Sequence, residues 1–433
     1  MQNSIDTVRI PMIEANPQSA LVDEPTQIQL KGFAPQQTVT LRARTVDHAK
    51  KAWASYAVFQ ADAQGNIDLS TQKPLSGTYR DLDMTGLFWS MLPVDTKQTT
   101  PFIHKTQQPM VIELVAEVEG EVVASTQVTR LFVAPGVKRQ PVRENGLVGT
   151  FFSPVGPGPH PAVIVLNGSD GGLRENPAAL LASRGYAALA LAYFNYEDLP
   201  RSLTDIPLEY FETAITWLQA QETVNAEKIA VIGLSRGGEL ALLLGSLFPA
   251  IKAVVSGAPS PFIQAGINET GRPSGPAWIF HDEPLPHVNV HVNFFIALAL
   301  CWQAFKHHAF AMRIMFLTTL KDRKNLEKAT IQVEHIQGPV LLISGEDDQL
   351  WPSTLFAERI MDRLAQHQHP YLYEHLRYKG AGHFVCFPYG LPSLPPYVQP
   401  APGIAFGGSI AANAHSVRDS WPKILAFLEK ALR

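Results

Sequence analysis

After residue 160, short runs of consecutive apolar residues alternate with segments of helical period. The apolar runs occupy residues 161–166, 187–192, 229–232, 253–256 and 340–344. Strands that are buried on both faces of a parallel sheet have this continuous apolar character. Helical patterns cover residues 177–184, 207–221, 239–247 and 354–366. The alternation predicts a doubly wound, mostly parallel α/β sheet, with functional sites at the carboxyl ends of its strands.

The residues before about 132 have a different period. Apolar and polar residues alternate over 27–33, 38–44, 111–118 and 127–133, and turn residues separate runs of this kind. Regularly spaced short strands predict an antiparallel β-sandwich. Residues 134–141, which include two prolines and a glycine, are interpreted as a linker. We therefore expect an all-β scaffold domain over 1–135 and an α/β catalytic domain over 136–433.

A serine motif lies between one apolar run and one helical segment, at Gly233-Leu234-Ser235-Arg236-Gly237. This is the G-x-S-x-G pattern of a nucleophile elbow, in the strand–turn–helix context that gives the pattern meaning. A serine hydroxyl becomes an effective nucleophile when a sharp turn holds it beside a base and oxyanion donors. The two glycines lack the Cβ atoms that would block such a turn. Ser235 is therefore the predicted nucleophile of an α/β hydrolase.

The acid and the base of such a triad follow the serine in that order along the chain. Asp347 and Asp348 come directly after the apolar run at 340–344. Asp348 is the predicted acid because it stands three residues after Gly345, and Asp347 is the alternative. The purely structural alternative is that this acidic pair caps the helix that starts at Ser353. His383, on a glycine-flanked loop after a strand-like segment, is the predicted base, which the carboxylate would orient.

Two backbone N–H groups are expected to form the oxyanion hole. Arg236 supplies the first because it follows the nucleophile. The glycine-rich loop 167–172, after the run at 161–166, supplies the second, with Ser169 as the predicted donor. This loop lacks the Lys-Ser/Thr ending of a P-loop, so we do not interpret it as a phosphate cradle.

Composition excludes several other classes of protein. The net charge of −4 gives no basic footprint, so no nucleic-acid partner is expected. Two cysteines cannot form a disulfide framework, and the first residues lack a signal-peptide pattern, so we expect a cytoplasmic protein. The longest apolar stretches, 292–302 and 309–320, are shorter than the ~18 residues of a membrane span.

The histidines offer one alternative chemistry. His287 and His291 are four residues apart and could share one helix face to bind a metal. No third ligand is evident, and the HExxH pattern of metalloproteases is absent. We therefore expect neither a metal nor another cofactor.

The chain resembles a known family, the type I acyl-CoA thioesterases with their relative bile acid-CoA:amino acid N-acyltransferase. The resemblance covers nearly the whole chain, and it is specific in six segments: residues 85–92, 190–200, 208–212, 233–240 and 345–351, and Gly382-His383 with Pro388-Tyr389. It implies an N-terminal immunoglobulin-like sandwich joined to a C-terminal α/β-hydrolase domain. It also implies a triad of Ser235, Asp348 and His383 acting on an acyl-CoA thioester.

The resemblance leaves the acceptor of the acyl group open. The transferase of this family has cysteine at the nucleophile, whereas the thioesterases have serine, so Ser235 favours hydrolysis by water. The alternatives are an acyl-CoA:amino acid N-acyltransferase and a carboxylesterase or dienelactone-type hydrolase that cleaves an oxygen ester. A fourth hypothesis is a binding protein built on a decayed hydrolase, which the intact order of serine, acid and histidine disfavours.

One segment departs from the family pattern. Residues 281–337 contain two apolar amphiphilic runs, Phe294–Trp302 and Phe310–Phe316, with no close family match. We interpret the segment as a cap or insert. Its apolar runs either form a pair of cap helices that pack on the sheet or form a wall that receives the acyl chain.

Overall fold

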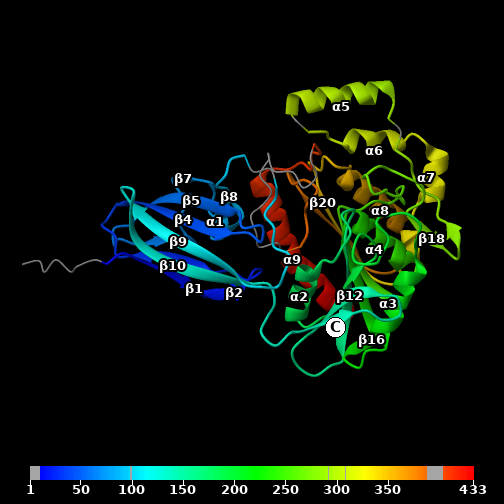
Figure 1. The fold of residues 1–433 in the computed structure, drawn as a ribbon, viewed down its shortest axis with the longest axis horizontal. Helices are drawn as coiled ribbons and strands as arrows, with labels where there is room; N and C mark the ends of the chain where they lie inside the picture. The colour runs from blue at the N-terminus through cyan, green and yellow to red at the C-terminus, as the bar shows by residue number, and fades with distance from the viewer. Residues whose placement is uncertain (1–9, 98–99, 291, 308, 388–402) are drawn as a thin grey trace, which may run out of the picture. The chain divides into compact units, whose positions relative to one another are not determined.

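The computed structural model describes residues 10–97, 100–290, 292–307, 309–387 and 403–433. Within these residues the chain divides into two compact units, one ending at Phe132 and the other beginning at Val133 (Figure 1). Each unit has its own sheets and its own buried core.

The first unit is built almost entirely from strands arranged in two sheets. A three-stranded antiparallel sheet has the order β1 (Met12–Asn16), β3 (Gln27–Lys31), β6 (Ile67–Asp68). The larger sheet has the order β2 (Ser19–Leu21), β10 (Glu121–Leu131), β9 (Met110–Val118), β4 (Thr38–Val46), β5 (Ala52–Gln60), β7 (Ser76–Gly77), and β8 (Leu92–Pro93) also pairs with β5. One short helix, α1 (Gly86–Trp89), accompanies them.

Side-chain alternation explains how this unit forms its core. Along β4, Val39, Leu41 and Ala43 are fully buried, while the residues between them are partly or fully exposed. A strand with one face on the core and one toward solvent has this pattern. The predicted short strands with alternating burial are therefore confirmed. One feature differs from the expected antiparallel pairing, because β2 pairs parallel to β10.

The second unit contains an eight-stranded mixed sheet. Its strand order is β11 (Lys138–Val142), β12 (Val148–Ser153), β14 (Ala187–Ala192), β13 (His160–Leu166), β16 (Val224–Leu234), β17 (Ile251–Gly257), β20 (Val340–Gly345), β21 (Tyr373–Tyr378). The pairs β11–β12 and β12–β14 are antiparallel, and every later pair is parallel. The predicted mostly parallel sheet is confirmed.

Helices cover both faces of this sheet (Figure 1). The helices α3 (Glu209–Gln219), α4 (Arg236–Leu247) and α8 (Ser353–Gln366) share one core with the strand residues Ile164, Val231 and Leu342. The helices α2 (Glu175–Ser183) and α9 (Ile410–Leu432) pack on the other face. Burial on both faces accounts for the continuous apolar runs in the sequence.

The predicted linker is partly wrong. Residues 138–142 form the edge strand β11 instead of a loop. An edge strand needs backbone hydrogen bonds on one side only, so Pro141 can occupy it without leaving a donor unpaired in the sheet. Its proline and polar residues are typical of a linker, so the sequence pattern does not distinguish the two.

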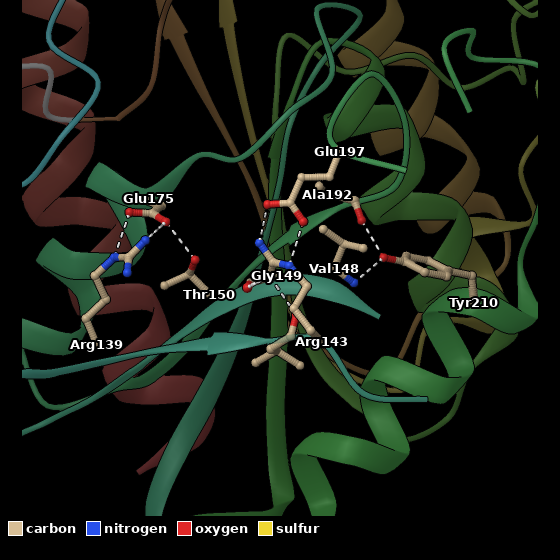
Figure 2. A network of polar contacts seen from close by, with 10 residues as sticks. Arg139, Arg143, Val148, Gly149, Thr150, Glu175, Ala192, Glu197 and Tyr210 are labelled. Atoms are coloured by element: carbon tan, nitrogen blue, oxygen red, sulfur yellow. Dashed lines mark hydrogen bonds and ion pairs between the residues drawn. The ribbon is translucent and has the colours of Figure 1, made fainter. Parts of the chain in front are cut away.

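Ion pairs and hydroxyl contacts hold this antiparallel edge in place (Figure 2). Arg139 binds Glu175 at 2.6 Å, and Glu175 also accepts a hydrogen bond from Thr150 of β12. Arg143 binds Glu197 through two nitrogens at 2.7 Å and donates to the carbonyl of Gly149. The Tyr210 hydroxyl donates to Ala192 and accepts from Val148. These contacts fasten β11 and β12 to α2, α3 and the loop after β14.

The segment between β17 and β20 consists of short elements, and some of its residues, such as Trp278 and Ile336, belong to the main core of the second unit. It contains β18 (Trp278–Phe280) and β19 (Glu283–Pro284), which with β15 (Ile206–Pro207) make a small sheet. The helices α5 (Phe294–His307), α6 (Arg313–Thr319) and α7 (Arg323–Ala329) follow, and then the 3-10 turn η1 (Val333–His335). The segment expected as a cap or insert at 281–337 therefore contains these three helices.

Candidate active site

Ser235 occupies a strained turn between strand and helix. The strand β16 ends at Leu234, α4 begins at Arg236, and Ser235 between them has φ 60° and ψ −123°. Few non-glycine residues adopt such angles, which cost of order 1–3 kcal/mol and need support from their surroundings. The support comes from a 2.8 Å hydrogen bond from the Ser235 amide to Gly257 and from the first turn of α4, where the Glu239 amide donates to the Ser235 carbonyl.

The two motif glycines are required by close backbone approach. A Cβ atom on Gly233 would lie 2.1 Å from the carbonyl oxygen of Gly237. A Cβ atom on Gly237 would lie 2.3 Å from the carbonyl oxygen of Asn167. Non-bonded atoms do not approach this closely, so the elbow accepts only glycine at both positions. The second contact also shows that α4 packs closely against the loop after β13.

The acid and the base predicted from the sequence are in contact. Asp348 follows β20, and its Oδ2 lies 2.9 Å from Nδ1 of His383. The other carboxylate oxygen accepts the amides of Leu350 and Trp351 at 2.9 and 3.2 Å. Both side chains are almost completely buried, at 0% and 2% exposure. The carboxylate is therefore fixed by its own turn and holds the imidazole in one orientation.

Asp347 has a different role. Its side chain is exposed, and its Oδ2 accepts the amide of Gly408 at 3.0 Å. The structure thus brings Asp348, and not Asp347, to the imidazole. The helix-capping alternative for this acidic pair is not observed, because no side chain caps the start of α8.

The free nitrogen of the imidazole is available for proton transfer. Among the described residues, Nε2 of His383 is buried and makes no hydrogen bond. The ring is surrounded by Trp351, Phe384 and Phe406, with ring centroids 5.6–6.0 Å away. The segment that carries His383 continues to Cys386, which approaches the elbow, because a Cβ atom on Gly257 would lie 2.3 Å from Sγ of Cys386. Gly257 is the residue whose carbonyl binds the Ser235 amide.

The loop after β13 lies directly beside Ser235. A Cβ atom on Gly168 would be 3.7 Å from Cβ of Ser235. Ser169 is exposed at the following turn, and in the described part of the chain neither its amide nor that of Arg236 makes a backbone hydrogen bond. The amide of Arg236 is free because it is the first residue of α4, where helical amides have no partner within the helix.

Asn167 fixes this loop, and the sequence prediction missed it. Its side-chain oxygen accepts the Gly168 amide at 2.8 Å and Nε of Arg174 at 2.6 Å, and its side-chain nitrogen donates to Gly171. Its carbonyl accepts the Tyr193 hydroxyl at 2.6 Å. The Gly168 amide is thus bound to Asn167, whereas the Ser169 amide makes no backbone hydrogen bond in the described part of the chain. An asparagine at a strand end before glycine was the available signal.

A buried ion pair lies beneath the elbow and was also missed. Arg236 binds Glu239 at 2.9 Å, and both side chains are almost completely buried. Arg236 also donates to the Gln264 carbonyl, and Glu239 accepts from Trp278 and from the Gln264 amide. Burial raises the pKa of Glu239 to about 7, although the guanidinium favours its charged form. This pairing directs the Arg236 side chain into the core and leaves its amide at the elbow.

Other expectations concern residues outside this cluster. His291 lies outside the described residues, so the metal-binding pair with His287 is not tested, and Pro388 and Tyr389 lie outside them too. Within the described ranges, no group of three His, Cys, Asp or Glu side chains is arranged to hold a metal ion. No helix in the described part of the chain is long and apolar enough to cross a bilayer.

Comparisons with known proteins identify relatives over nearly the whole chain. Residues 206–433 match the family model described as BAAT / Acyl-CoA thioester hydrolase C terminal, and residues 23–144 match that described as Acyl-CoA thioester hydrolase/BAAT N-terminal region. Acyl-coenzyme A thioesterase 1 of Mus musculus is 33% identical, over 95% of this chain and 94% of that protein. Acyl-coenzyme A amino acid N-acyltransferase 1 of Mus musculus is 34% identical, over 96% and 97%. Peroxisomal succinyl-coenzyme A thioesterase of Mus musculus is 32% identical, over 95% and 94%.

Proposed function

The chain belongs to the acyl-CoA thioester hydrolase/BAAT family, and on that premise we propose that it hydrolyses acyl-CoA thioesters to free acid and coenzyme A. The observation that carries the proposal is the buried Asp348–His383 pair, together with a serine held at a strained elbow. A serine with an oriented imidazole forms an acyl-enzyme and needs no metal for the reaction.

The first half-reaction transfers the acyl group to the enzyme. Nε2 of His383 takes the proton of the Ser235 hydroxyl while Oγ attacks the thioester carbonyl carbon. The amides of Arg236 and Ser169 donate to the oxygen that becomes negatively charged. The carbonyl re-forms as the C–S bond breaks, and the sulfur takes a proton from the imidazolium. A thiol has a pKa near ~8.5, so sulfur leaves readily.

The second half-reaction releases the acid. Water gives a proton to His383 and attacks the acyl-Ser235 carbonyl, and the same two amides stabilise the second oxyanion. Collapse of this intermediate returns the proton from the imidazolium to Oγ of Ser235. Asp348 stabilises the positive imidazole in both halves and takes no part in the proton transfers.

The test is thiol release from a panel of acyl-CoA thioesters of increasing chain length. We expect the purified protein to turn over these substrates and Ser235→Ala to lose at least about 10⁴-fold in kcat. The free energy of unfolding of this variant should change by no more than about 1 kcal/mol. Turnover that survives this substitution, or that requires an added metal ion, would contradict the proposal.

Two arms separate the alternative functions. Glycine and taurine are added as acceptors, because one relative is named as an amino acid N-acyltransferase. Formation of N-acyl product in place of free acid would replace hydrolysis by acyl transfer. Oxygen esters of matched chain length form the second arm, and faster cleavage of these would indicate a carboxylesterase.

We further propose that the N-terminal two-sheet domain is immunoglobulin-like and that the enzyme works in the cytoplasm. The arrangement of its strands in two sheets supports the first statement. Two unpaired cysteines, Cys301 and Cys386, support a reducing compartment. Fractionation of cells that express the tagged protein tests the compartment, and recovery in a membrane-enclosed organelle would contradict it.

A further inference from the structure

The helix α5 presents an apolar face to solvent. Five of its large side chains are 59–80% exposed, namely Phe294, Phe295, Leu298, Trp302 and Phe305. At 100° per residue these positions fall within one arc of about 100° around the helix axis. Their rings contact one another, with centroids 5.9 Å apart for Phe294–Phe295 and 6.2 Å for Trp302–Phe305. Exposed apolar patches of this kind mark contact surfaces.

The opposite side of α5 holds the helix to the protein. Ile296 is 5% exposed, and Oε1 of Gln303 accepts the Ala311 amide at 3.0 Å. Asn293 caps the helix, since its side chain accepts the Ile296 amide at 2.9 Å. In the described residues α5 makes no extensive contact with another helix or strand, and Figure 1 shows it at the periphery of the second unit. The apolar face is therefore the outer one.

The segment around α5, residues 284–321, has a charge opposite to that of the whole chain. Residues 284–321 contain no Asp or Glu, although the whole chain carries a net charge of −4. Three basic residues lie in that stretch, Lys306, Arg313 and Lys321, and the side chains of both lysines are exposed. On the helix wheel Lys306 falls directly beside the apolar arc. A long basic side chain at this position can reach past the apolar face to a negatively charged group.

Together these features fit a negatively charged lipid surface. A helix with aromatic and leucine side chains on one face and lysine at its edge lies in the plane of a bilayer, with its apolar face among the headgroups. The length of α5, 14 residues or about 21 Å, is too short for the ~30 Å hydrocarbon core. We propose that α5 docks the protein on anionic membrane surfaces through Phe294, Phe295, Leu298, Trp302 and Phe305.

A second copy of the chain is the competing occupant of this face. Each partner in a stable dimer buries about 800 Å² of accessible surface, so this single helix face would have to supply the whole of such an interface. Two copies meeting there would also bring their Lys306 side chains together. A lipid surface has neither difficulty, because it has no fixed outline and its charge is opposite.

The test measures binding of the full chain to vesicles of phosphatidylcholine with phosphatidylglycerol, and to vesicles of phosphatidylcholine alone, by co-sedimentation. The combined variant Phe295→Ser, Trp302→Ser and Phe305→Ser is expected to weaken binding to the mixed vesicles at least about 50-fold. Lys306→Glu is expected to weaken it about tenfold, with a smaller effect on neutral vesicles. The matched control replaces Leu75, Leu82 and Val94, which are 54–64% exposed in the first unit, by serine and should bind as the wild type does.

Three outcomes would overturn the proposal. The first is wild-type protein that does not sediment with anionic vesicles, and the second is equal binding by the α5 variant and the control. The third is a dimer in analytical ultracentrifugation that the α5 variant abolishes while vesicle binding is unchanged, which would assign the face to a second copy. None of these readouts depends on catalytic activity, so the docking proposal stands or fails separately from the proposed hydrolysis.

Discussion

Two aspartates follow β20, and their surroundings give them different chemistry. Asp348 is buried, with one oxygen on two amides of its own turn and the other on the imidazole of His383. Asp347 is exposed and holds the Gly408 amide. A buried carboxylate on Nδ1 keeps the proton there and leaves Nε2 as the acceptor. The two neighbours thus provide an internal comparison.

Asp348→Asn should lower kcat by about 10³–10⁴-fold with little change in KM. The amide can donate to Nδ1, which forces the proton onto Nε2 and removes the base that Ser235 needs. Asp347→Asn is the matched control and should retain activity within about threefold. Thiol release from an acyl-CoA measures both. Equal losses in the two variants would mean that the acid is misassigned.

A second residue-scale prediction concerns the elbow. Gly237→Ala places a methyl group 2.3 Å from the Asn167 carbonyl, and this backbone cannot yield without moving the loop beside the nucleophile. We expect the free energy of unfolding to fall by about 2–3 kcal/mol and hydrolysis to be lost.

Gly120→Ala is the control for this prediction. Its φ of +90° imposes about 1 kcal/mol of strain, but nothing lies within 4 Å of the new methyl group. It should therefore keep full activity. Urea unfolding and the thiol assay compare the two variants, and an active, equally stable Gly237→Ala would refute the steric argument.

The residues of the site differ in how far the sequence predicts them. Ser235, Asp348 and His383 stand at strand ends in the order that a hydrolase triad requires, so local pattern was sufficient. Asn167 and Glu239 have no such pattern. Their roles come from bonds to groups distant in sequence, such as the Tyr193 hydroxyl and the Trp278 indole. Side-chain bonds to remote groups leave no periodicity to detect.

At the scale of elements, the buried central strands were predictable because burial on both faces demands apolar residues. The edge strand β11 was not, since its polar residues and proline resemble a linker. The helices α5 and α6 lie on the two apolar runs that one interpretation made a pair of cap helices, although their nearly continuous apolar residues have no clean period. In α5 the missing period follows from an outer face that is apolar as well, and we propose that this face docks on membranes.

The pairing of β20 with β21 includes a pH-sensitive contact. Nε2 of His375 lies 2.7 Å from Oγ of Ser344, and burial, with help from Arg377, lowers the pKa of His375 to about 4. The unfolded chain has the ordinary histidine pKa of about 6.5 and therefore binds more protons between pH 6.5 and pH 4. Stability contributed by the neutral ring is complete above pH 6.5 and is lost as pH falls through 4.

His375→Gln should remove this part of the acid sensitivity. Urea unfolding at pH 7 and pH 4 should show a loss smaller than that of the wild type by on the order of 1–2 kcal/mol, after allowance for partial solvent screening. His281→Gln, which removes an imidazole that is 77% exposed, serves as control and should behave as the wild type. An unchanged acid loss in His375→Gln would show that this imidazole has the same pKa in the folded and unfolded chains.

At the scale of the whole molecule, the chain buries two separate sets of apolar residues. Leu41, Ile112 and Phe59 belong to the core of the first unit, and Ile164, Val231 and Leu342 to that of the second. A unit with its own core can unfold as its own cooperative transition. The proposed catalytic residues lie entirely in the second unit, so activity should follow that transition alone.

Substitutions in each core test this separation. Leu41→Ala and Ile164→Ala each empty a fully buried site, which costs about 2–5 kcal/mol in the unit that contains it. In scanning calorimetry, Leu41→Ala should lower one transition and leave the temperature of half-loss of hydrolysis unchanged, whereas Ile164→Ala should lower the other transition and that temperature together. A single transition shifted equally by both substitutions would mean that the two cores unfold as one. In that case the first domain would contribute to the stability of the catalytic domain, and activity would depend on both.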